Sequence, residues 1–501
     1  MAPFVFIHFS HGQTTIIALI IPPAPLYFKH FSGRIRGIRL YFLRCNMKKT
    51  AGIIAEYNPI HRGHQYHIQQ TRLLTQADYI IVAMSGDYVQ RGTPAVFDKY
   101  HRTRMALLSG ADLVVELPVC YATASAEYFA LGGIWTLDSL GIVTDLCFGS
   151  ESGDLASLLA LAKLLSHEPE DYQTLLRACL KKGVSFPVAR REALLSYINT
   201  YPDLPKSQWN KLLESPNNIL GIEYLKALNR LHSSIHPHTV LRDGACYHET
   251  QLPDSSIFTS ASALRRALAD SAPFKQLAPY LPSDCRTYFQ QILASGELLW
   301  TDDFSLLLHM RLIQENADSL TCYVDVTPEL ANRIENRKTE YRSFSQFTEL
   351  LKTKELTHTR IQRALLHILL GITELSFPPY IRLLGVRKES RELLSLIQKH
   401  SSVPVCAGTG RALRDLPASS YGLIRQQLYP SELYQSVLLS LIHISLSYRR
   451  ESPVCQTHSF HISSGILSEP VCSSILPEGL YRYHSEIQFD WQSAPKSCNL
   501  L

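Results

Sequence analysis

The 501-residue sequence lacks any CxxC pair, although it contains 11 cysteines. These cysteines are odd in number and scattered from Cys45 to Cys498, which favours reduced thiols in a cytosolic protein over a disulfide framework or a zinc site. An apolar run long enough to span a membrane is also lacking, since residues 15–25 are broken by Pro22 and Pro23. We therefore expect a cytoplasmic protein that has neither a membrane partner nor a bound structural metal.

Acidic residues are absent from the first 46 positions, which carry several basic ones. This composition would suit a targeting peptide, but no small-residue cleavage site follows. Because Met47-Lys-Lys-Thr50 stands just before the first expected strand, we expect Met47 to be the initiator and residues 1–46 to be a non-native extension. Residues 436–501 form a second atypical segment, where a Ser, Pro, Cys and His-rich composition without a sustained period indicates a disordered or artefactual tail.

Between these ends the composition is that of an ordinary globular chain. The sequence is 46% hydrophobic and 19% charged, and its length leaves room for two or three domains. The formal net charge of +5 is mildly basic. This charge permits an RNA partner without demanding one.

Strands and helices alternate along residues 50–150. Short apolar strands are expected at residues 52–55, 79–84, 113–115 and 145–148, and helices near residues 64–75, 98–108 and 122–140. Continuous apolar strands separated by helices predict a parallel sheet that is covered on both faces. Ligands of such sheets bind beyond the carboxyl ends of the strands, so the loops that follow these strands should meet at one edge.

The rest of the chain is expected to be mostly helical. Residues 151–235 carry amphipathic helices, a strand returns near residues 239–242, and residues 275–435 look almost entirely helical. This pattern divides the chain into an extension at 1–46, an ATP-binding domain at 47–270, a helical RNA-binding domain at 271–435 and a tail at 436–501.

The most informative segment is Ala51-Gly-Ile-Ile-Ala-Glu-Tyr-Asn-Pro-Ile-His-Arg-Gly-His64. An apolar strand leads into a polar turn, which delivers His61 and His64 to the expected start of a helix. A helix start presents unpaired N–H groups and a positive dipole end to an anion. The imidazoles are one helical turn apart, so they point the same way and add donors where phosphate charge develops. Gly63 leaves room for a nucleotide beside them.

A histidine pair near a glycine is usually a surface turn, and short motifs have a real false-positive rate. Here the strand before the pair and the helix after it supply the context that a nucleotide site requires. The segment therefore predicts a site that binds ATP and lets a nucleophile displace pyrophosphate at the α-phosphate.

A second candidate segment is Ser260-Ala-Ser262-Ala-Leu-Arg265. Hydroxyls and N–H groups at a helix start, followed by an arginine, suit a triphosphate, and Arg265 would balance charge on the leaving pyrophosphate. Serine capping alone is the commoner reason for such a segment, but the histidine turn in the same chain favours function. Arg242 follows an expected strand, and by itself it would be interpreted as a surface charge. Asn217 stands at an expected helix start, and by itself it would be interpreted as an N-cap.

Two more polar features follow strands at this edge. The loop at residues 87–92 suits an acyl or phosphate group, and an ordinary solvated loop explains it equally well. Glu116 follows the third strand, and the sequence leaves its role open.

Spaced basic residues occur on the helices beyond residue 345, with Tyr380 among them. This spacing suits an RNA phosphate backbone, although on charge alone a solvated helix face is the simpler explanation. The candidate RNA contacts are Lys354, Arg360, Arg363, Arg387 and Lys388.

With these residues in hand, the chain resembles the bacterial tRNA(Met) cytidine acetate ligase family, within the HIGH-motif nucleotidyltransferases. The resemblance spans about residues 47–435, and the order and number of its blocks make it specific. The blocks are residues 52–64, 84–92, 110–118, 148–151, 215–224, 260–265 and 359–371. It implies an α/β fold, in which a Rossmann-like parallel-sheet nucleotidyltransferase domain precedes a mostly α-helical C-terminal domain.

The resemblance also implies an activity. ATP and acetate would form acetyl-adenylate with loss of pyrophosphate, and the acetyl group would pass to N4 of the wobble cytidine of elongator tRNA(Met). His61, His64 and Arg265 would be catalytic, with the histidines stabilising the transition state at the α-phosphate. The basic helices would hold tRNA, Mg²⁺ is expected with the triphosphate, and the sequence leaves a homodimer open.

ATP contacts carry over to named positions. They are Ile53, Ile54, Ala55, Glu56, Tyr57, Asn58, Pro59, Ile60, His61, Arg62, Gly63, His64, Gln65, Tyr66, Gly149, Asn217 and Arg242, to which the residue argument above adds Ser260 and Ser262. Arg62 stands where relatives commonly have asparagine, so altered contacts are expected there.

Two other functions fit the same histidines. An adenylyltransferase that joins AMP to a phosphorylated metabolite would use the same displacement at phosphorus, but it has little use for a long basic helical half. A non-catalytic RNA-binding module would not need both histidines and Arg265. We therefore rank the ligase first, the metabolite adenylyltransferase second and the binding module third.

Overall fold

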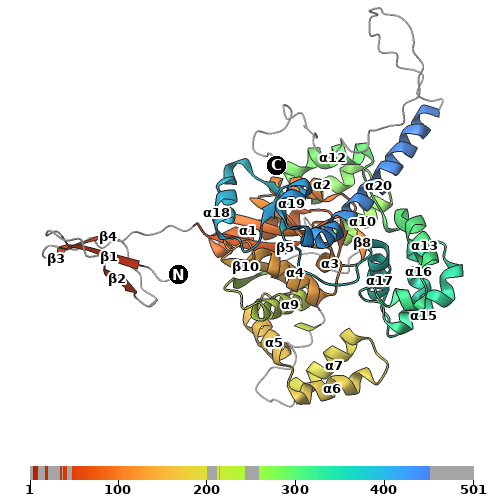
Figure 1. Cartoon of the computed structure of the whole chain (residues 1–501), viewed down its shortest axis with the longest axis horizontal. Helices are drawn as coiled ribbons and strands as arrows, with labels where there is room; N and C mark the ends of the chain where they lie inside the picture. Colours follow the sequence, from red (N-terminus) through yellow and green to blue (C-terminus); the bar gives the residue numbers. More distant parts are fainter. Residues whose placement is uncertain are drawn as a thin grey trace, which may run out of the picture. The chain divides into compact units, whose positions relative to one another are not determined.

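The computed structural model describes residues 48–199, 212–213, 215–242 and 259–451, together with four short strands within residues 4–41. The chain divides into two compact units, Met1–Lys48 and Lys49–Leu501 (Figure 1). None of the helices in the described ranges combines the length and the apolar character that a membrane span requires.

The first unit contains a small antiparallel sheet. Its strands are β1 (Phe4–Phe9), β2 (Ile17–Ile20), β3 (Arg34–Ile35) and β4 (Ile38–Tyr41), in the order β2-β1-β4-β3. This segment was expected only as a non-native extension, and its strands are short runs rich in β-branched and aromatic residues.

A seven-stranded sheet forms the centre of the second unit. Its order is β11-β10-β5-β6-β9-β12-β13. The strands are β5 (Thr50–Ala55), β6 (Tyr79–Ser85), β9 (Leu113–Leu117), β10 (Asp145–Ser150), β11 (His236–Leu241), β12 (Ile381–Val386) and β13 (Val405–Cys406). The first five strands of this order are parallel, as the sequence predicts, whereas β12 is antiparallel to β9. A two-stranded hairpin of β7 (Tyr88–Val89) and β8 (Thr93–Pro94) lies outside this sheet.

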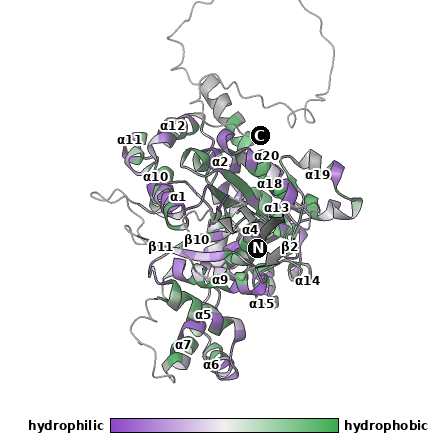
Figure 2. Ribbon diagram, turned by 90° about the vertical axis from the view of Figure 1, so that its left-hand side faces the viewer, coloured by the Kyte–Doolittle hydropathy of each residue, from purple (hydrophilic) through white to green (hydrophobic). Residues whose placement is uncertain are grey.

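Alternate residues of the buried strands face two separate cores. In β6, Ile80 and Val82 join a core with α1 (Arg62–Thr75), α2 (Lys99–Leu108), α10 (Ala261–Ala269) and α12 (Arg286–Ser295). Ile81 and Ala83 join a larger core with α4 (Ala126–Asp138), α5 (Leu155–His167) and α9 (Pro216–Arg230). Figure 2 shows α1, α10 and α12 together on one side and α5 and α9 on another. Helices on both faces explain why the strands read as continuous apolar runs.

The helices before the C-terminal half are α1 (Arg62–Thr75), α2 (Lys99–Leu108), α3 (Val119–Ala122), α4 (Ala126–Asp138), α5 (Leu155–His167), α6 (Glu170–Leu180), α7 (Phe186–Asn199), α9 (Pro216–Arg230) and α10 (Ala261–Ala269). Those that follow are α11 (Phe274–Leu277), α12 (Arg286–Ser295), α13 (Ser305–Gln314), α14 (Ala317–Leu320), α15 (Pro328–Arg337), α16 (Phe344–Leu351), α17 (His358–Leu370), α18 (Glu392–His400), α19 (Thr409–Asp415) and α20 (Tyr421–Glu451).

The expectation of an almost entirely helical run over residues 275–435 is wrong at one place. β12 and β13 interrupt the helices and extend the central sheet. The physical reason is that Ile381-Arg-Leu-Leu-Gly-Val386 is a short apolar run that follows two prolines, and it hydrogen-bonds to the open side of β9. The expected tail begins inside α20, and its remainder at 452–501 lies outside the described residues.

Candidate active site

The turn after β5 presents two histidines at the start of α1. His61 is the N-cap, and its Nδ1 accepts a hydrogen bond of 3.1 Å from the N–H of Gly63. The rings of His61 and His64 stack with their centroids 3.8 Å apart, and Tyr57 packs edge-on against His64 at 5.0 Å. The expected strand–turn–helix therefore forms, and it places both imidazoles together.

The histidines are neutral donors at physiological pH. Burial, with Arg242 and Arg265 nearby, lowers the pKa of His61 to about 3, and burial with His61 and Arg242 holds the pKa of His64 well below its ordinary value. Since Nδ1 of neutral His61 accepts from Gly63, its proton is on Nε2. That N–H is left to donate to a ligand at the helix N-terminus.

The serine segment is brought onto the histidine turn. Ser260 caps α10, where its Oγ accepts from the N–H of Ala263 at 3.0 Å. Arg265 then reaches across: its Nη1 donates to the carbonyl of Asn58 at 2.6 Å, and its Nη2 donates to Ser262 Oγ at 3.1 Å. Two motifs about 200 residues apart therefore form one edge, as the sequence argument requires.

The neighbouring strands β10 and β11 bring Gly149 beside Arg242. A Cβ at Gly149 would lie 3.1 Å from Arg242 Cγ, and this arginine is exposed directly after β11. Asn217 lies in the first turn of α9, but its Nδ2 donates to Glu151 Oε1 at 2.6 Å. The carboxylate of Glu151 also accepts from the N–H of Asn218 at 2.9 Å, so it occupies the α9 N-terminus.

The other predicted ATP contacts lie along the same turn with different exposure. Ile53, Tyr57 and Ile60 are buried. Asn58 Oδ1 accepts from the N–H of Val96 at 2.8 Å. The remaining positions, Ile54, Ala55, Glu56, Arg62, Gly63, Gln65 and Tyr66, are half-buried, and Pro59 is buried.

Beyond β6 and β9 lies a buried ion cluster that the sequence did not reveal. Lys99 Nζ lies 2.8 Å from Glu116 Oε1 and 3.2 Å from Asp87 Oδ2. It also donates to Ser431 of α20 at 2.5 Å. The loop of Asp87 is therefore not a solvated one, since this carboxylate is buried and paired.

Arg102 ties the ends of β5 and β6 together. Its Nη1 donates to the carbonyls of Glu56 at 2.6 Å and Ser85 at 3.0 Å, and its Nη2 donates to the carbonyl of Gly86. No sequence signal marks Lys99 or Arg102, because a basic residue on a helix usually faces solvent.

The predicted RNA contacts separate into three places. Lys354 is exposed before α17 and Arg360 is half-buried on its first turn, whereas Arg363 Nε donates to Asp325 at 2.9 Å. Arg387 and Lys388 follow β12. Because β12 is antiparallel to β9, these two lie beside the amino end of β9, at the opposite edge from the histidines. Within the described residues, no three His, Cys, Asp or Glu side chains are grouped to hold a metal ion.

Comparisons with known proteins agree on one family. The HIGH nucleotidyl transferase family matches residues 47–444. The tRNA(Met) cytidine acetate ligase of Clostridium novyi is 39% identical, over 73% of this chain and 91% of its own length. The enzyme of that name from a Thermoanaerobacter species is 38% identical, over 76% and 94%.

Solved structures give the same result. Thermotoga maritima TmcAL bound with α-thio ATP superposes with a TM-score of 0.71 at 32% identity, covering 78% of this chain and 95% of that one. Its apo form gives a TM-score of 0.73 at 33% identity, with the same coverage.

Proposed function

Because this chain belongs to the HIGH nucleotidyl transferase family, among the tRNA(Met) cytidine acetate ligases, we propose that it joins acetate to a cytidine of tRNA(Met) at the expense of ATP. The observation that carries this function is the convergence of His61, His64, Arg242 and Arg265 at the N-terminus of α1. The superposed Thermotoga maritima structure holds an ATP analogue, which supports ATP as the substrate.

In the first step, an acetate oxygen attacks the α-phosphorus of ATP, and the bond from that phosphorus to pyrophosphate breaks. The N–H groups of α1 and the Nε2 proton of His61 face the charge that develops on the phosphate. Arg265, fixed by the carbonyl of Asn58 and by Ser262, is positioned to balance the leaving pyrophosphate. We expect Mg²⁺ with the triphosphate, since Mg²⁺ is usually held through substrate phosphates and one or two carboxylates.

In the second step, N4 of the wobble cytidine of elongator tRNA(Met) attacks the carbonyl carbon of acetyl-adenylate. The bond to AMP breaks, and N4 loses a proton. We propose that the chain works in the cytoplasm, where it meets this tRNA.

For tRNA binding, we propose Lys354 and Arg360 as the primary backbone contacts, because Lys354 is exposed just before α17 and Arg360 lies on the first turn of that helix. Replacing both by Ala should weaken tRNA binding and flatten its salt dependence, while adenylate formation stays unchanged. The contrasting variant is Arg363→Ala, which breaks the pair with Asp325 and should cost stability instead. Unchanged tRNA affinity in the double variant would assign these residues to a solvated face.

The test of the reaction is direct. The full chain is incubated with ATP, labelled acetate and total tRNA, and N4-acetylcytidine is sought by mass spectrometry. Label in the methionine tRNA is the expected result. Label that stops at acetyl-adenylate would contradict the transfer step, and the absence of any acetate-dependent adenylate would favour the metabolite adenylyltransferase. Sedimentation of the same preparation shows whether the protein is a homodimer.

A further inference from the structure

The turn between α6 and α7 carries exposed basic and apolar side chains together. Lys181 and Lys182 directly follow α6, and both are exposed. Leu180 before them is 39% exposed, and Phe186, which begins α7, is 51% exposed. Ammonium groups beside an aromatic ring in solvent are the combination that binds a single-stranded nucleic acid, through its phosphates and its unstacked bases.

The shape of this turn is fixed by its glycine and by the helices on either side. Gly183 has a φ of +70°, in the left-handed region that favours glycine, and its N–H donates to the carbonyl of Leu180 at 3.0 Å. Arg190 of α7 donates to the buried carboxylate of Glu223 on α9 at 2.7 Å. Because α9 carries Asn217 in its first turn, the α6–α7 turn is anchored to an element of the predicted ATP site.

The α6–α7 turn lies against the loop that precedes α17. A Cβ on Gly183 would lie 3.2 Å from Glu355 Oε1, so two segments about 170 residues apart in the sequence are in contact. Lys354 directly precedes this glutamate, Lys352 stands two residues earlier, and both lysines are exposed. The lysines of the two segments therefore gather in one region, the lysine surface, which comprises residues 180–186 and 352–360.

The acidic side chains near the lysine surface leave an excess of positive charge. The basic side chains are Arg177, Lys181, Lys182, Lys352, Lys354 and Arg360, and the carboxylates beside them are those of Glu192, Glu329, Glu349 and Glu355. Lys182 Nζ is 3.9 Å from Glu192, and Lys352 Nζ is 3.6 Å from Glu349. These four side chains are at least 42% exposed, and exposed ion pairs contribute little, so a phosphate can compete with the carboxylates.

α17 connects the lysine surface to the histidine turn. Gly92, in the hairpin of β7 and β8, packs so closely on α17 that a Cβ would lie 2.5 Å from the backbone nitrogen of Arg363. In the same hairpin, the N–H of Gln90 donates to Glu56 Oε1 at 2.9 Å, and Glu56 belongs to the turn after β5. An RNA strand that passes from the lysine surface along α17 therefore reaches the edge where acetyl-adenylate is expected.

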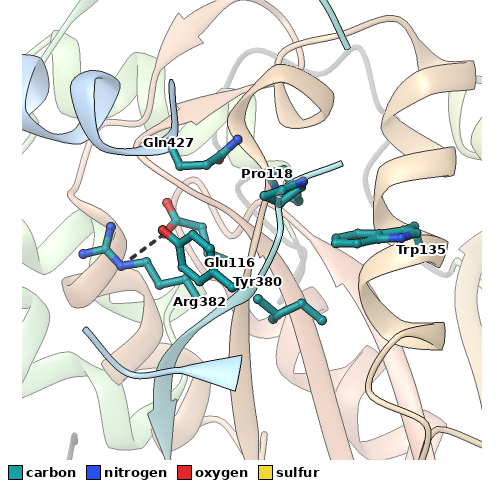
Figure 3. A pocket seen from close by; sticks show the side chains of 8 residues that line it. Glu116, Pro118, Trp135, Tyr380, Arg382 and Gln427 are labelled. Carbon is teal, nitrogen blue, oxygen red and sulfur yellow. Dashed lines mark ion pairs between the residues drawn. The ribbon is translucent and has the colours of Figure 1, made fainter. Parts of the chain in front are cut away.

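The end of β9, farther along the same edge, is closed by side chains. Figure 3 shows Trp135 and Tyr380 near the Glu116–Arg382 ion pair. Glu116 is also paired with Lys99 at 2.8 Å, and Tyr380 is only 2% exposed. RNA is therefore expected to approach the edge from the side of α17 and not from that of β12.

We propose that the lysine surface binds the tRNA, with its lysines on backbone phosphates and Phe186 stacked on an unpaired base. This assignment rests on the proposed function, whose tRNA contacts it extends to the α6–α7 turn. Phosphate contacts position a nucleic acid but do not read its sequence. The lysine surface therefore supplies affinity and orientation, and the choice of the cytidine is made at the adenylate.

Two variants of the full chain test the α6–α7 turn, with binding of a tRNA(Met) transcript measured over a range of salt concentrations. The double variant Lys181→Ala/Lys182→Ala should bind about tenfold more weakly at about 0.15 M salt. Because two phosphate contacts are lost, the slope of log K against log salt should decrease by about 1.5. Phe186→Leu should weaken binding by about fivefold to a hundredfold at an unchanged slope, since stacking releases no counterions.

Each variant has a matched control. Lys275→Ala/Lys399→Ala removes the same charge from exposed lysines of α11 and α18, which Figure 2 shows at the opposite end of the molecule from α6 and α7. Phe186→Tyr keeps an aromatic ring at the turn. Both controls should bind as the wild type does. A control that weakens binding as much as its partner variant would overturn the proposal, as would wild-type affinity in both turn variants, which would leave the turn to a protein partner.

Acetate-dependent ATP–pyrophosphate exchange in the same preparations distinguishes this surface from the proposed reaction. If the wild type binds tRNA through the turn but shows no exchange, the proposed reaction fails and the lysine surface stands. If both turn variants lose exchange together with binding, the substitutions act on the ATP site, and the lysine surface is overturned. A wild type that binds no tRNA would overturn it as well.

Discussion

Replacing Lys99 by Met removes the positive charge at the centre of the buried cluster. The Lys99 side chain is 1% exposed and lies between two carboxylates, those of Asp87 and Glu116. Burial alone would lower the pKa of Lys99, but the carboxylates outweigh burial and the opposing charge of Arg382, so the pKa is raised. The lysine is therefore charged, and its loss leaves two buried anions with less compensation.

The expected cost follows from what remains. Removing one partner of a buried ion pair typically costs about 3–5 kcal/mol. Arg102 still compensates Asp87, and Arg382 stays 3.6 Å from Glu116, so we expect about 3 kcal/mol, the lower end of that range. A loss of this size is a large fraction of the stability of a typical protein.

Urea unfolding at pH 7, followed by circular dichroism, measures this loss. The matched control is Lys163→Met on α5, where the side chain is exposed and a change within about 0.5 kcal/mol is expected. The pKa of Asp87 is lowered in the wild type because Lys99 and Arg102 outweigh its burial, so that part of the stability is present at neutral pH and lost on acidification. The gap between variant and wild type should therefore narrow as pH falls. If Lys99→Met lowered the free energy of unfolding by less than 1 kcal/mol and left its pH dependence unchanged, the charges of this cluster could not be desolvated as the structure indicates.

Three further predictions concern the same edge of the sheet. His64→Ala should slow acetyl-adenylate formation by about 10²–10³, as for a lost oxyanion donor, and an unchanged exchange rate would contradict this role. The pKa of His61 is about 3 in the folded chain and 6.5 ordinarily, so the unfolded chain binds more protons between these two pH values. The free energy of unfolding should therefore fall by about 2 kcal/mol from pH 7 to pH 5. Urea midpoints that stay the same over this range would show that the His61 ring is not buried in its neutral form. Gly86→Ala places a methyl group against the Glu116 carboxylate, so thermal melting should show a loss of about 1–3 kcal/mol, and a stability equal to wild type would mean that the carboxylate can move aside.

The sequence was sufficient for the features that depend on local patterning. The strands β5, β6, β9 and β10 are continuous apolar runs, which is what burial on both faces produces, and all four form. The start of α1 was marked by its histidines and glycine. The placement of the serine segment at the same edge followed from the chemistry, since a triphosphate needs more charge than one helix start supplies.

Features that depend on distant pairing were not predictable in this way. β12 pairs with β9, which lies more than 250 residues earlier, and no local sequence pattern in either strand predicts this pairing. From the sequence, Lys99 is likewise expected at the surface, and only the structure shows the carboxylates of Asp87 and Glu116 beside its amine. The positions of Arg387 and Lys388, at the far edge of the sheet, follow only from the antiparallel direction of β12.

The antiparallel direction of β12 also determines which residues of the C-terminal half lie beside the carboxyl edge of the sheet. Because β12 starts at the carboxyl end of β9, Tyr380 and Arg382 arrive beside Glu116, where a parallel strand would have delivered its other end. The chain then continues to α20, whose Ser431 accepts from Lys99 and whose Tyr434 donates to the carbonyl of Ala95 at 2.8 Å. The segment that follows the basic helices therefore packs against the carboxyl edge of the central sheet, the same edge that carries the histidine turn.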